Sequence, residues 1–208
     1  MKYQYWSEIS FYLNEIDQQK SVTFERKVTP EKLAALRASI LIQLNQLKDS
    51  LKPLLEEYPT YLILFAIIAC IDEEIHCLLP VQDQMEWVPI QQDFYNTSNA
   101  GELFYKTLDE ILDDPTIPTI VFEVFYFILK RGFSGKYVKS KTKISRYLDF
   151  LSEKISVVTT SKKEKGSIFN ASKRWNIRPW QWYGMTIMLI FSVYAILYFS
   201  SNTLINFI

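Results

Sequence analysis

Histidine, cysteine and glycine are scarce in this chain of 208 residues, which has one His, two Cys and five Gly. A single His cannot complete a multi-histidine metal site, and no HExxH motif is present. It also leaves a Ser–His or Cys–His nucleophile with little support. Without a Walker loop or a GxGxxG motif, nucleotide binding has no motif behind it. We therefore expect no cofactor, no metal and no enzymatic activity.

The small number of glycines, together with long apolar periodicities, favours helices over a turn-rich β fold. The two cysteines, Cys70 and Cys77, are seven residues apart. On one helix they would lie about 10 Å apart along the axis, which is too far for a disulfide. They are typical of reduced cytosolic thiols.

Charge is missing from the end of the chain, where nothing charged follows Arg178. The last 30 residues, 179–208, are mostly apolar. Because roughly 20 helical residues cross the hydrocarbon core of a bilayer, this segment is long enough to span it. The sequence predicts a C-terminal transmembrane helix and a short far-side tip within residues 180–208. The alternative is a buried C-terminal helix of a soluble protein, although such helices are usually shorter and interrupted by polar residues.

Basic side chains gather just before this segment, opposed only by Glu164. They are Lys162, Lys163, Lys165, Lys173, Arg174 and Arg178. Basic flanks stay on the cytoplasmic side, and anionic headgroups attract them. We therefore expect residues 1–156 to form a cytoplasmic domain and residues 157–179 a basic juxtamembrane linker that contacts membrane lipid. The C-terminus would lie on the far side of the membrane, opposite the cytoplasmic domain.

The net charge of zero hides an asymmetry along the chain. Residues 72–123 carry 12 acidic side chains and only Lys106, whereas residues 130–178 carry 14 basic side chains and three acidic ones. The acidic section either faces a cytoplasmic partner or consists of ordinary solvated helix faces. Residues 130–146 combine basic and aromatic side chains, which could suit nucleic acid. Proximity to the membrane explains them more simply, so we expect no nucleic-acid partner.

Apolar spacing predicts a bundle of helices. Residues 4–18 form a weak helix with Tyr5, Phe11, Tyr12 and Ile16, and a polar stretch follows to Thr29. Thr29-Pro30 is a good helix start, and the leucine and isoleucine spacing that follows marks one face up to residue 51. Residues 61–71 are apolar all round, which predicts a central helix that stops at residues 72–74.

Further along, residues 79–98 lack periodicity and predict a long loop with Trp87 as an anchor. Asn99 and Glu102 have the spacing of a capping box at the start of a helix that runs to residue 112. A second helix covers residues 120–129 and ends at Gly132. An amphipathic helix covers residues 144–155, and a Ser/Lys-rich linker begins at residue 157.

Asp72 and Glu73 are unusual because an acidic pair is unfavourable at the negative, C-terminal end of a helix. They either bind a partner in a cleft or simply face water at the helix end. The same region keeps an enzymatic alternative open, a tail-anchored enzyme or regulator that uses Asp72, Glu73 and His76. A helix would place Asp72 and His76 four residues apart, although Glu73 and Cys77 then point in another direction.

An ordered set of short motifs resembles the DotU/TssL (IcmH/DotU) family of type VI and type IVB secretion systems. The motifs lie between residues 30 and 155, ahead of the predicted membrane anchor. They are Ile71-Asp72-Glu73, then Trp87, then Asp93-Phe94-Tyr95-Asn96-Thr97, then Ala100-Gly101-Glu102-Leu103-Phe104-Tyr105, then Phe122-Glu123-Val124-Phe125-Tyr126, then Gly132-Phe133-Ser134-Gly135-Lys136-Tyr137. No single motif is specific, whereas the ordered set is. Their characteristic residues are expected to be structural, and the acidic pair is expected to bind a partner.

The resemblance implies an all-α cytoplasmic domain of two stacked helical bundles, hook-like, with a cleft near their junction. It implies a non-enzymatic inner-membrane subunit of a bacterial type VI secretion system, required for effector secretion. Its expected partners are an IcmF/TssM-type membrane protein, a TssK-type baseplate subunit and further copies of itself.

Three departures from the family pattern stand out. Arg131, before Gly132-Phe133, stands where the family usually has an apolar residue. Lys136 stands where the family more commonly has an Arg. The peptidoglycan-binding extension of some relatives does not follow the predicted membrane helix, so we expect another subunit to supply any cell-wall anchoring.

Overall fold

The structure is a computed structural model that describes residues 2–25 and 27–163. The chain divides into a unit of residues 1–166 and a unit of residues 167–208, of which the second lies outside the described residues. The described part contains helices and no strand, so the all-α prediction is confirmed there. Its elements are α1 (Lys2–Phe24), α2 (Pro30–Leu51), α3 (Glu57–Leu78), η1 (Val81–Glu86), α4 (Gln91–Tyr95), α5 (Ala100–Leu112), α6 (Thr119–Arg131), η2 (Gly135–Tyr137) and α7 (Lys141–Lys163).

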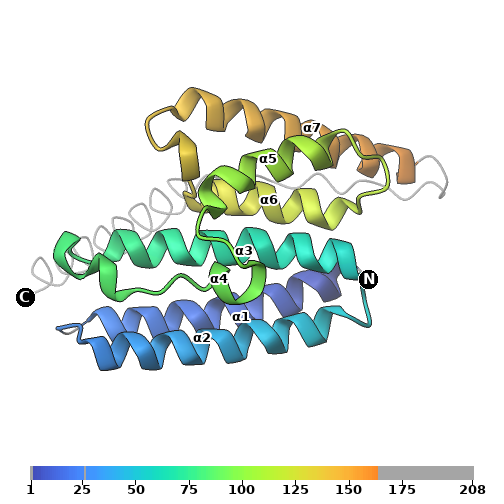
Figure 1. The fold of residues 1–208 in the computed structure, drawn as a ribbon. Helices are drawn as coiled ribbons and strands as arrows, with labels where there is room; N and C mark the ends of the chain where they lie inside the picture. The colour runs from blue at the N-terminus through green and yellow to red at the C-terminus, as the bar shows by residue number, and fades with distance from the viewer. Residues whose placement is uncertain (1, 26, 164–208) are drawn as a thin grey trace, which may run out of the picture. The chain divides into compact units, whose positions relative to one another are not determined.

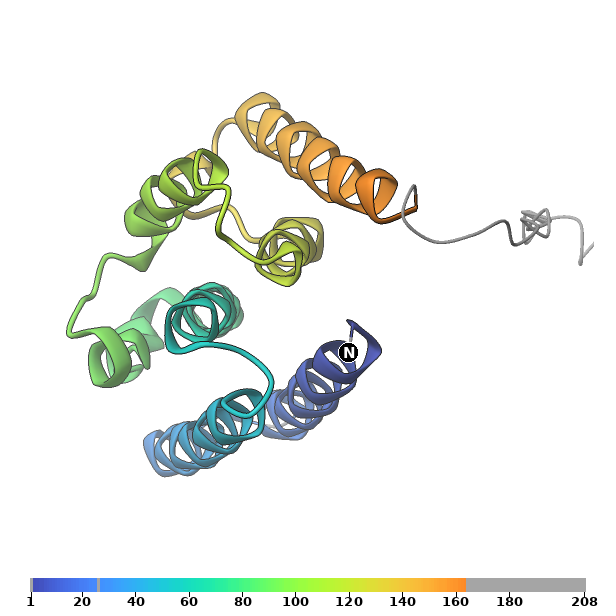
Figure 2. The same ribbon diagram turned by 90° about the vertical axis from the view of Figure 1, so that its right-hand side faces the viewer.

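The central helix is α3, as its sequence predicts. Every residue from Leu62 to Asp72 is buried, because neighbours cover this helix on all sides. In Figure 1, α1 and α2 lie on one side of α3, whereas α5, α6 and α7 lie on the other side. Figure 2 shows the same arrangement with the helices viewed nearly end-on. One contiguous hydrophobic core joins the two sides through α3.

The helix α2 begins and packs as expected. The Thr29 side chain accepts a hydrogen bond from the backbone N–H of Lys32, and Pro30 occupies the first turn. Such a cap satisfies one of the donors that a helix start leaves free. The predicted stripe is buried and consists of Leu33, Leu36, Ile40, Leu44, Leu47 and Leu51.

The helix α6 ends at Gly132, as predicted. Gly132 has a φ of 114°, a conformation that side chains disfavour, and its N–H donates to the carbonyls of Ile128 and Leu129. The chain can therefore turn sharply and place Phe133 in the core. The Asn99–Glu102 capping box does not form, because Asn99 Nδ2 donates to Glu102 Oε2 at 2.9 Å and makes no side-chain bond to the backbone.

Several predicted boundaries are wrong. The first helix runs to Phe24 rather than residue 18, and it buries Ile9, Leu13 and Ile16 while Phe11 is exposed. The central helix continues through residues 72–74 to Leu78. The predicted loop 79–98 contains η1 and α4. The last helix continues to Lys163, so the first residues of the predicted linker are helical.

The predicted transmembrane segment 180–208 lies outside the described residues. So do Lys165, Lys173, Arg174 and Arg178, whereas Lys162 and Lys163 occupy the end of α7. Among the described residues, no helix combines the length and the apolar character that a membrane span requires.

Candidate functional site

Three consecutive acidic residues in α3, Asp72, Glu73 and Glu74, connect the central helix to three other parts of the fold. The sequence predicted them at the C-terminal end of the helix. They lie instead within α3, more than one turn before its end at Leu78. Successive helical residues point in different directions around the axis, so each carboxylate meets a different neighbour. None of the three simply faces water.

Asp72 holds the segment that follows α3. Its side chain is buried, with only 5% of the residue exposed. Trp87 Nε1 and the Ile90 N–H donate to Asp72 Oδ1 at 3.0 and 2.9 Å, and the Gln91 N–H donates to Oδ2 at 3.0 Å. Burial raises the pKa of Asp72, and these hydrogen bonds offset part of that effect. Asp72 therefore fixes Trp87 and the first turn of α4, and the predicted anchoring by Trp87 is confirmed.

Glu73 holds the turn between α6 and η2. The backbone N–H groups of Ser134 and Gly135 donate to its two carboxylate oxygens, each at 2.7 Å. Gly135 has a φ of 49°, and a Cβ at this position would lie 2.6 Å from the carbonyl oxygen of Gly101. Two family-motif glycines thus allow the start of α5 to approach the turn that Glu73 holds.

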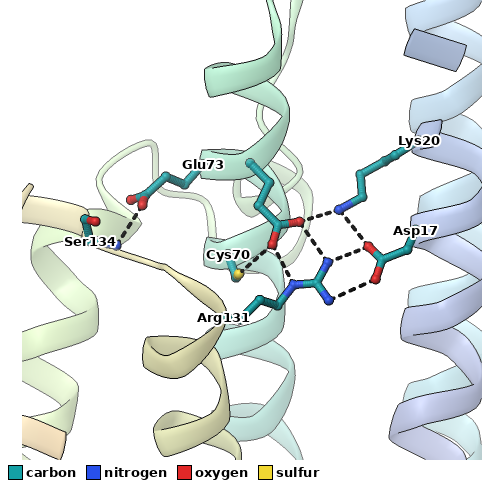
Figure 3. Close-up of polar contacts among 7 residues, drawn as sticks. Asp17, Lys20, Cys70, Glu73, Arg131 and Ser134 are labelled. Atoms are coloured by element: carbon teal, nitrogen blue, oxygen red, sulfur yellow. Dashed lines mark hydrogen bonds and ion pairs between the residues drawn. The ribbon is translucent and has the colours of Figure 1, made fainter. Parts of the chain in front are cut away.

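Glu74 belongs to an ion network that ties α3 to α1 and α6. Arg131, the last residue of α6, donates to Glu74 Oε2 at 3.0 Å and to Asp17 Oδ2 at 2.8 Å. Lys20 pairs with Asp17 at 2.8 Å and also with Glu74. Figure 3 shows Arg131 reaching Asp17 on α1, while Glu73 points the other way toward Ser134. Arg131, the departure from the family pattern, is the side chain that joins these three helices.

The network favours the charged form of its members. Burial opposes ionisation of Asp17 and Glu74, but hydrogen bonds from Arg131 and Lys20 outweigh it and lower the pKa of both carboxyls. The hydrogen bond to Glu74 raises the pKa of Arg131 above its ordinary value. Close to this network, burial and Glu74 raise the pKa of the Cys70 thiol, so Cys70 is an inert buried residue.

A cleft of about 540 Å³ opens beside the first two carboxylates. Its walls come from α3, η1, the start of α5 and the turn before η2, and they combine apolar with hydrogen-bonding groups. The lining residues are Ala69, Asp72, Glu73, His76, Gln84, Trp87, Pro89, Gln91, Ser98, Ala100, Gly101, Phe133 and Gly135. Five residues of the predicted motifs, Trp87, Ala100, Gly101, Phe133 and Gly135, therefore meet the acidic pair at one place.

The remaining motif residues support this region or lie apart from it. Phe104 is buried with its ring centroid 4.4 Å from that of Phe133, and Tyr137 packs on Tyr105 at 4.5 Å. Phe94 is half-buried on α4, and Glu102 is exposed at the start of α5. Glu123 lies elsewhere in the core and accepts a hydrogen bond from Trp6 Nε1 at 2.8 Å.

This geometry does not support the alternative function, an enzyme or regulator that uses Asp72, Glu73 and His76. Both Asp72 oxygens already accept hydrogen bonds, and Glu73 is held by two backbone N–H groups. Across residues 2–25 and 27–163, no group of three His, Cys, Asp or Glu side chains could hold a metal ion. Polar side chains at His76 and Ser98 line the cleft beside an apolar wall, whereas the Gln84 amide donates to the carbonyls of His76 and Leu79.

Sequence reasoning missed Asp17, Lys20 and Gln91. Lys20 is almost fully buried and continues the Ile9–Leu13–Ile16 spacing of α1, a signal that a search for apolar residues overlooks. Gln91 Oε1 accepts a hydrogen bond from the Ala100 N–H at 2.6 Å, so it fixes the start of α5.

Comparisons with known proteins agree with the motif set. The sequence profile described as "Type VI secretion system protein DotU" matches residues 21–202. The solved structure of DotU from Francisella novicida is 23% identical, covers 71% of this chain and 97% of its own, and has a TM-score of 0.61. The SciP/TssL structure from enteroaggregative Escherichia coli 042 is 17% identical, covers 85% and 97%, and has a TM-score of 0.59.

At these identities the two structures show a shared fold alone. A search among curated proteins found no match. The profile, however, covers well over half of the sequence, in the region that carries the ordered motifs. The chain belongs to the DotU family of type VI secretion system proteins.

Proposed function

We propose that this chain is a non-enzymatic structural subunit of the inner-membrane part of a type VI secretion system. In this proposal residues 180–208 anchor it in the membrane, residues 157–179 lie against anionic headgroups, and residues 1–156 are cytoplasmic. The charge-free C-terminal sequence and its basic flank support this topology. The helices on either side of α3 would correspond to two stacked bundles.

The same proposal makes the chain a link between an IcmF/TssM-type membrane protein and a TssK-type baseplate subunit, and makes this link necessary for effector secretion. The cleft beside Asp72 and Glu73 is the surface that we assign to one of these partners. The observation that carries this assignment is that the family's motif residues converge there, with polar groups at His76, Gln84 and Ser98 along its wall. Asp72 and Glu73 would act by fixing the cleft walls, since their carboxylates are engaged inside the protein.

A substitution that fills the cleft without touching its hydrogen-bonded supports tests the assignment. Ser98 is exposed at the rim, and Ser98→Trp would place a large ring where a partner segment should enter. We expect the Ser98→Trp chain to reach the membrane and keep its helical content. The amount of partner subunit that co-purifies with it should fall at least tenfold. Effector secretion should fall in parallel.

The matched control is Ser10→Trp, which adds the same ring to an exposed position of α1 outside the cleft. It should leave recovery of both partner subunits and secretion unchanged. Normal partner recovery with Ser98→Trp would refute the cleft as the docking site. Failure of the unsubstituted chain to recover either subunit from cells that express the apparatus would refute the linking role itself.

A further inference from the structure

Exposed basic side chains crowd the turn between α6 and α7. Five of them lie within residues 136–146, and no acidic residue lies between Ser134 and Leu148. They form what we call the basic turn and consist of Lys136, Lys139, Lys141, Lys143 and Arg146. Within residues 2–25 and 27–163, none of the five forms an ion pair. The described part of the protein therefore leaves these charges without a carboxylate partner.

The start of α7 makes this concentration of charge more unfavourable. The positive end of a helix dipole favours acidic residues, but the first turn of α7 has none and contains Lys141 and Lys143. The cations are therefore repelled both by one another and by the helix end. An anionic surface placed against the basic turn would relieve both repulsions.

A tyrosine ring and a valine complete this surface. The ammonium groups of Lys136 and Lys143 lie 5.2 and 4.8 Å from the centroid of the Tyr137 ring, so two cations that are seven residues apart meet at one ring. Val138, which follows this tyrosine, is 69% exposed. Positive charge beside a projecting apolar side chain is typical of segments that bind at the interface of a bilayer.

We propose that the basic turn binds the anionic headgroups of the membrane surface, with Val138 reaching toward the acyl chains. The inference goes beyond the proposed anchor, because it assigns a lipid contact to the described helical domain, ahead of residues 157–179. Figure 1 shows the turn into α7 on the side of α3 opposite α1 and α2, so this contact turns α1 and α2 away from the bilayer. Gly135, which lines the cleft, immediately precedes Lys136, so the same contact holds the rim of the cleft near the bilayer.

A bilayer fits this surface better than a nucleic acid or an acidic protein. Four of the five cations are lysines, whose compact charge suits many nearby phosphate groups without a fixed geometry. Nucleic acids are typically held by arginine forks and by aromatic rings that stack on bases, whereas the projecting side chain here is a valine. An acidic protein would have to match the spacing of these charges, while a fluid anionic surface adapts to it.

Quenching of a fluorescent probe by lipid tests the contact at the residue itself. In a Cys77→Ser background, which removes the exposed thiol, Val138→Cys of the full chain is labelled with a nitrobenzoxadiazole dye. The labelled chain is mixed with vesicles that contain a doxyl-labelled quencher lipid, either in phosphatidylcholine alone or with added phosphatidylglycerol. We expect at least threefold more quenching in the anionic vesicles, because only they attract the basic turn.

The matched control is Val22→Cys, which puts the same dye at a valine that is 63% exposed on α1. Its quenching should be low and equal in the two kinds of vesicle. Because each probe reports only its own position, binding of the vesicle through residues 157–208 alone gives no difference between the two sites.

Charge reversal tests the role of the cations. Lys139→Glu with Lys141→Glu, added to Val138→Cys, should lower the quenching to that of the control, because each basic residue strengthens binding to an anionic surface by about fivefold. Lys27→Glu with Lys48→Glu makes the same change of net charge at exposed positions outside the basic turn and should leave the quenching unchanged. Unchanged circular dichroism verifies that these surface variants fold.

Equal quenching at the two probes, or quenching at Val138→Cys that survives reversal of Lys139 and Lys141, would overturn the proposal. Binding of a DNA duplex that the same reversal abolishes, without quenching by lipid, would also overturn it and assign the basic turn to nucleic acid. Extraction of the chain from vesicles by alkaline carbonate would refute the membrane anchor alone, because the probe still reports whether the basic turn meets lipid.

Discussion

Replacement of Arg131 by Met tests how strongly the ion network holds α1 onto the rest of the fold. The change keeps an unbranched apolar stem but removes the guanidinium hydrogen bonds to Asp17 and Glu74. Lys20 would remain between the two carboxylates. The variant therefore measures the stability that Arg131 adds to an ion network that still contains Lys20.

The size of the effect follows from the degree of burial. The Arg131, Asp17 and Glu74 side chains are 22%, 36% and 27% exposed, so the network lies between the surface and the interior. Breaking a buried pair costs about 3–5 kcal/mol, whereas an exposed pair contributes about 0–1 kcal/mol. With Lys20 still present, we expect a loss of about 2 kcal/mol. For a unit of this size that lowers the melting temperature by about 4–8 °C.

The same network predicts how the loss depends on pH. Folding lowers the pKa of Asp17 and Glu74 below their ordinary values of 3.8 and 4.5. Their ionised forms therefore stabilise the fold above those values, and this contribution disappears as pH falls through the lower folded values. The difference between Arg131→Met and the unsubstituted chain should be full at pH 7 and shrink toward pH 3. Asp72, whose pKa is raised, titrates in both proteins, so its opposite contribution largely cancels.

Thermal unfolding of the full chain in detergent, followed by circular dichroism, measures this difference. The control is Lys52→Met, because Lys52 and Asp49 form a pair whose side chains are 60% and 68% exposed. It should leave the melting temperature unchanged at every pH. An unaltered melting temperature in Arg131→Met at pH 7, or a deficit that persists undiminished at pH 3, would refute the reasoning.

Two further predictions concern the supports of the cleft. Gly135→Ala should destabilise the protein by more than about 2 kcal/mol, because it adds both a positive φ and a contact of 2.6 Å with the Gly101 carbonyl oxygen. Gly132→Ala meets no atom within 4 Å and should cost only about 1–2 kcal/mol from its φ of 114°. Melting temperatures in the reverse order would contradict the close approach of the start of α5 to the turn at Gly135. Asp72→Asn puts an amide NH₂ against a backbone donor and should cost about 2 kcal/mol. Amide exchange should then accelerate at the start of α4, and unchanged exchange there would show that Asp72 does not hold this segment.

Local sequence was sufficient for the elements whose signal is periodic. The spacing of the apolar residues between Leu33 and Leu51 predicts α2, and Thr29-Pro30 predicts its first turn. The unbroken apolar run before Asp72 predicts a central helix, because only a surrounded helix can bury every side. The glycine after α6 predicts its end. In each case the residues involved lie within a turn or two of one another.

The candidate site could be predicted only in part, because its contacts join distant segments. The order of the family motifs identified Trp87, Gly101, Phe133 and Gly135, but not that they meet at one cleft. Asp72 marks the end of an apolar run in the sequence and was therefore expected at a helix end. In the fold it receives hydrogen bonds from residues 15–19 positions later, so the helix continues past it.

The sequence by itself determined that the chain is helical, which helix is central, and which family it resembles. Those properties depend on the periodicity of apolar residues, helix caps and the order of short motifs, all of which can be read along the chain. Only the tertiary structure decided what the charged residues of α3 do. A carboxylate inside a core is stable only when N–H groups or cations meet it, and for Glu73 and Glu74 those partners come from segments 54–62 residues away. No local pattern can specify such a meeting.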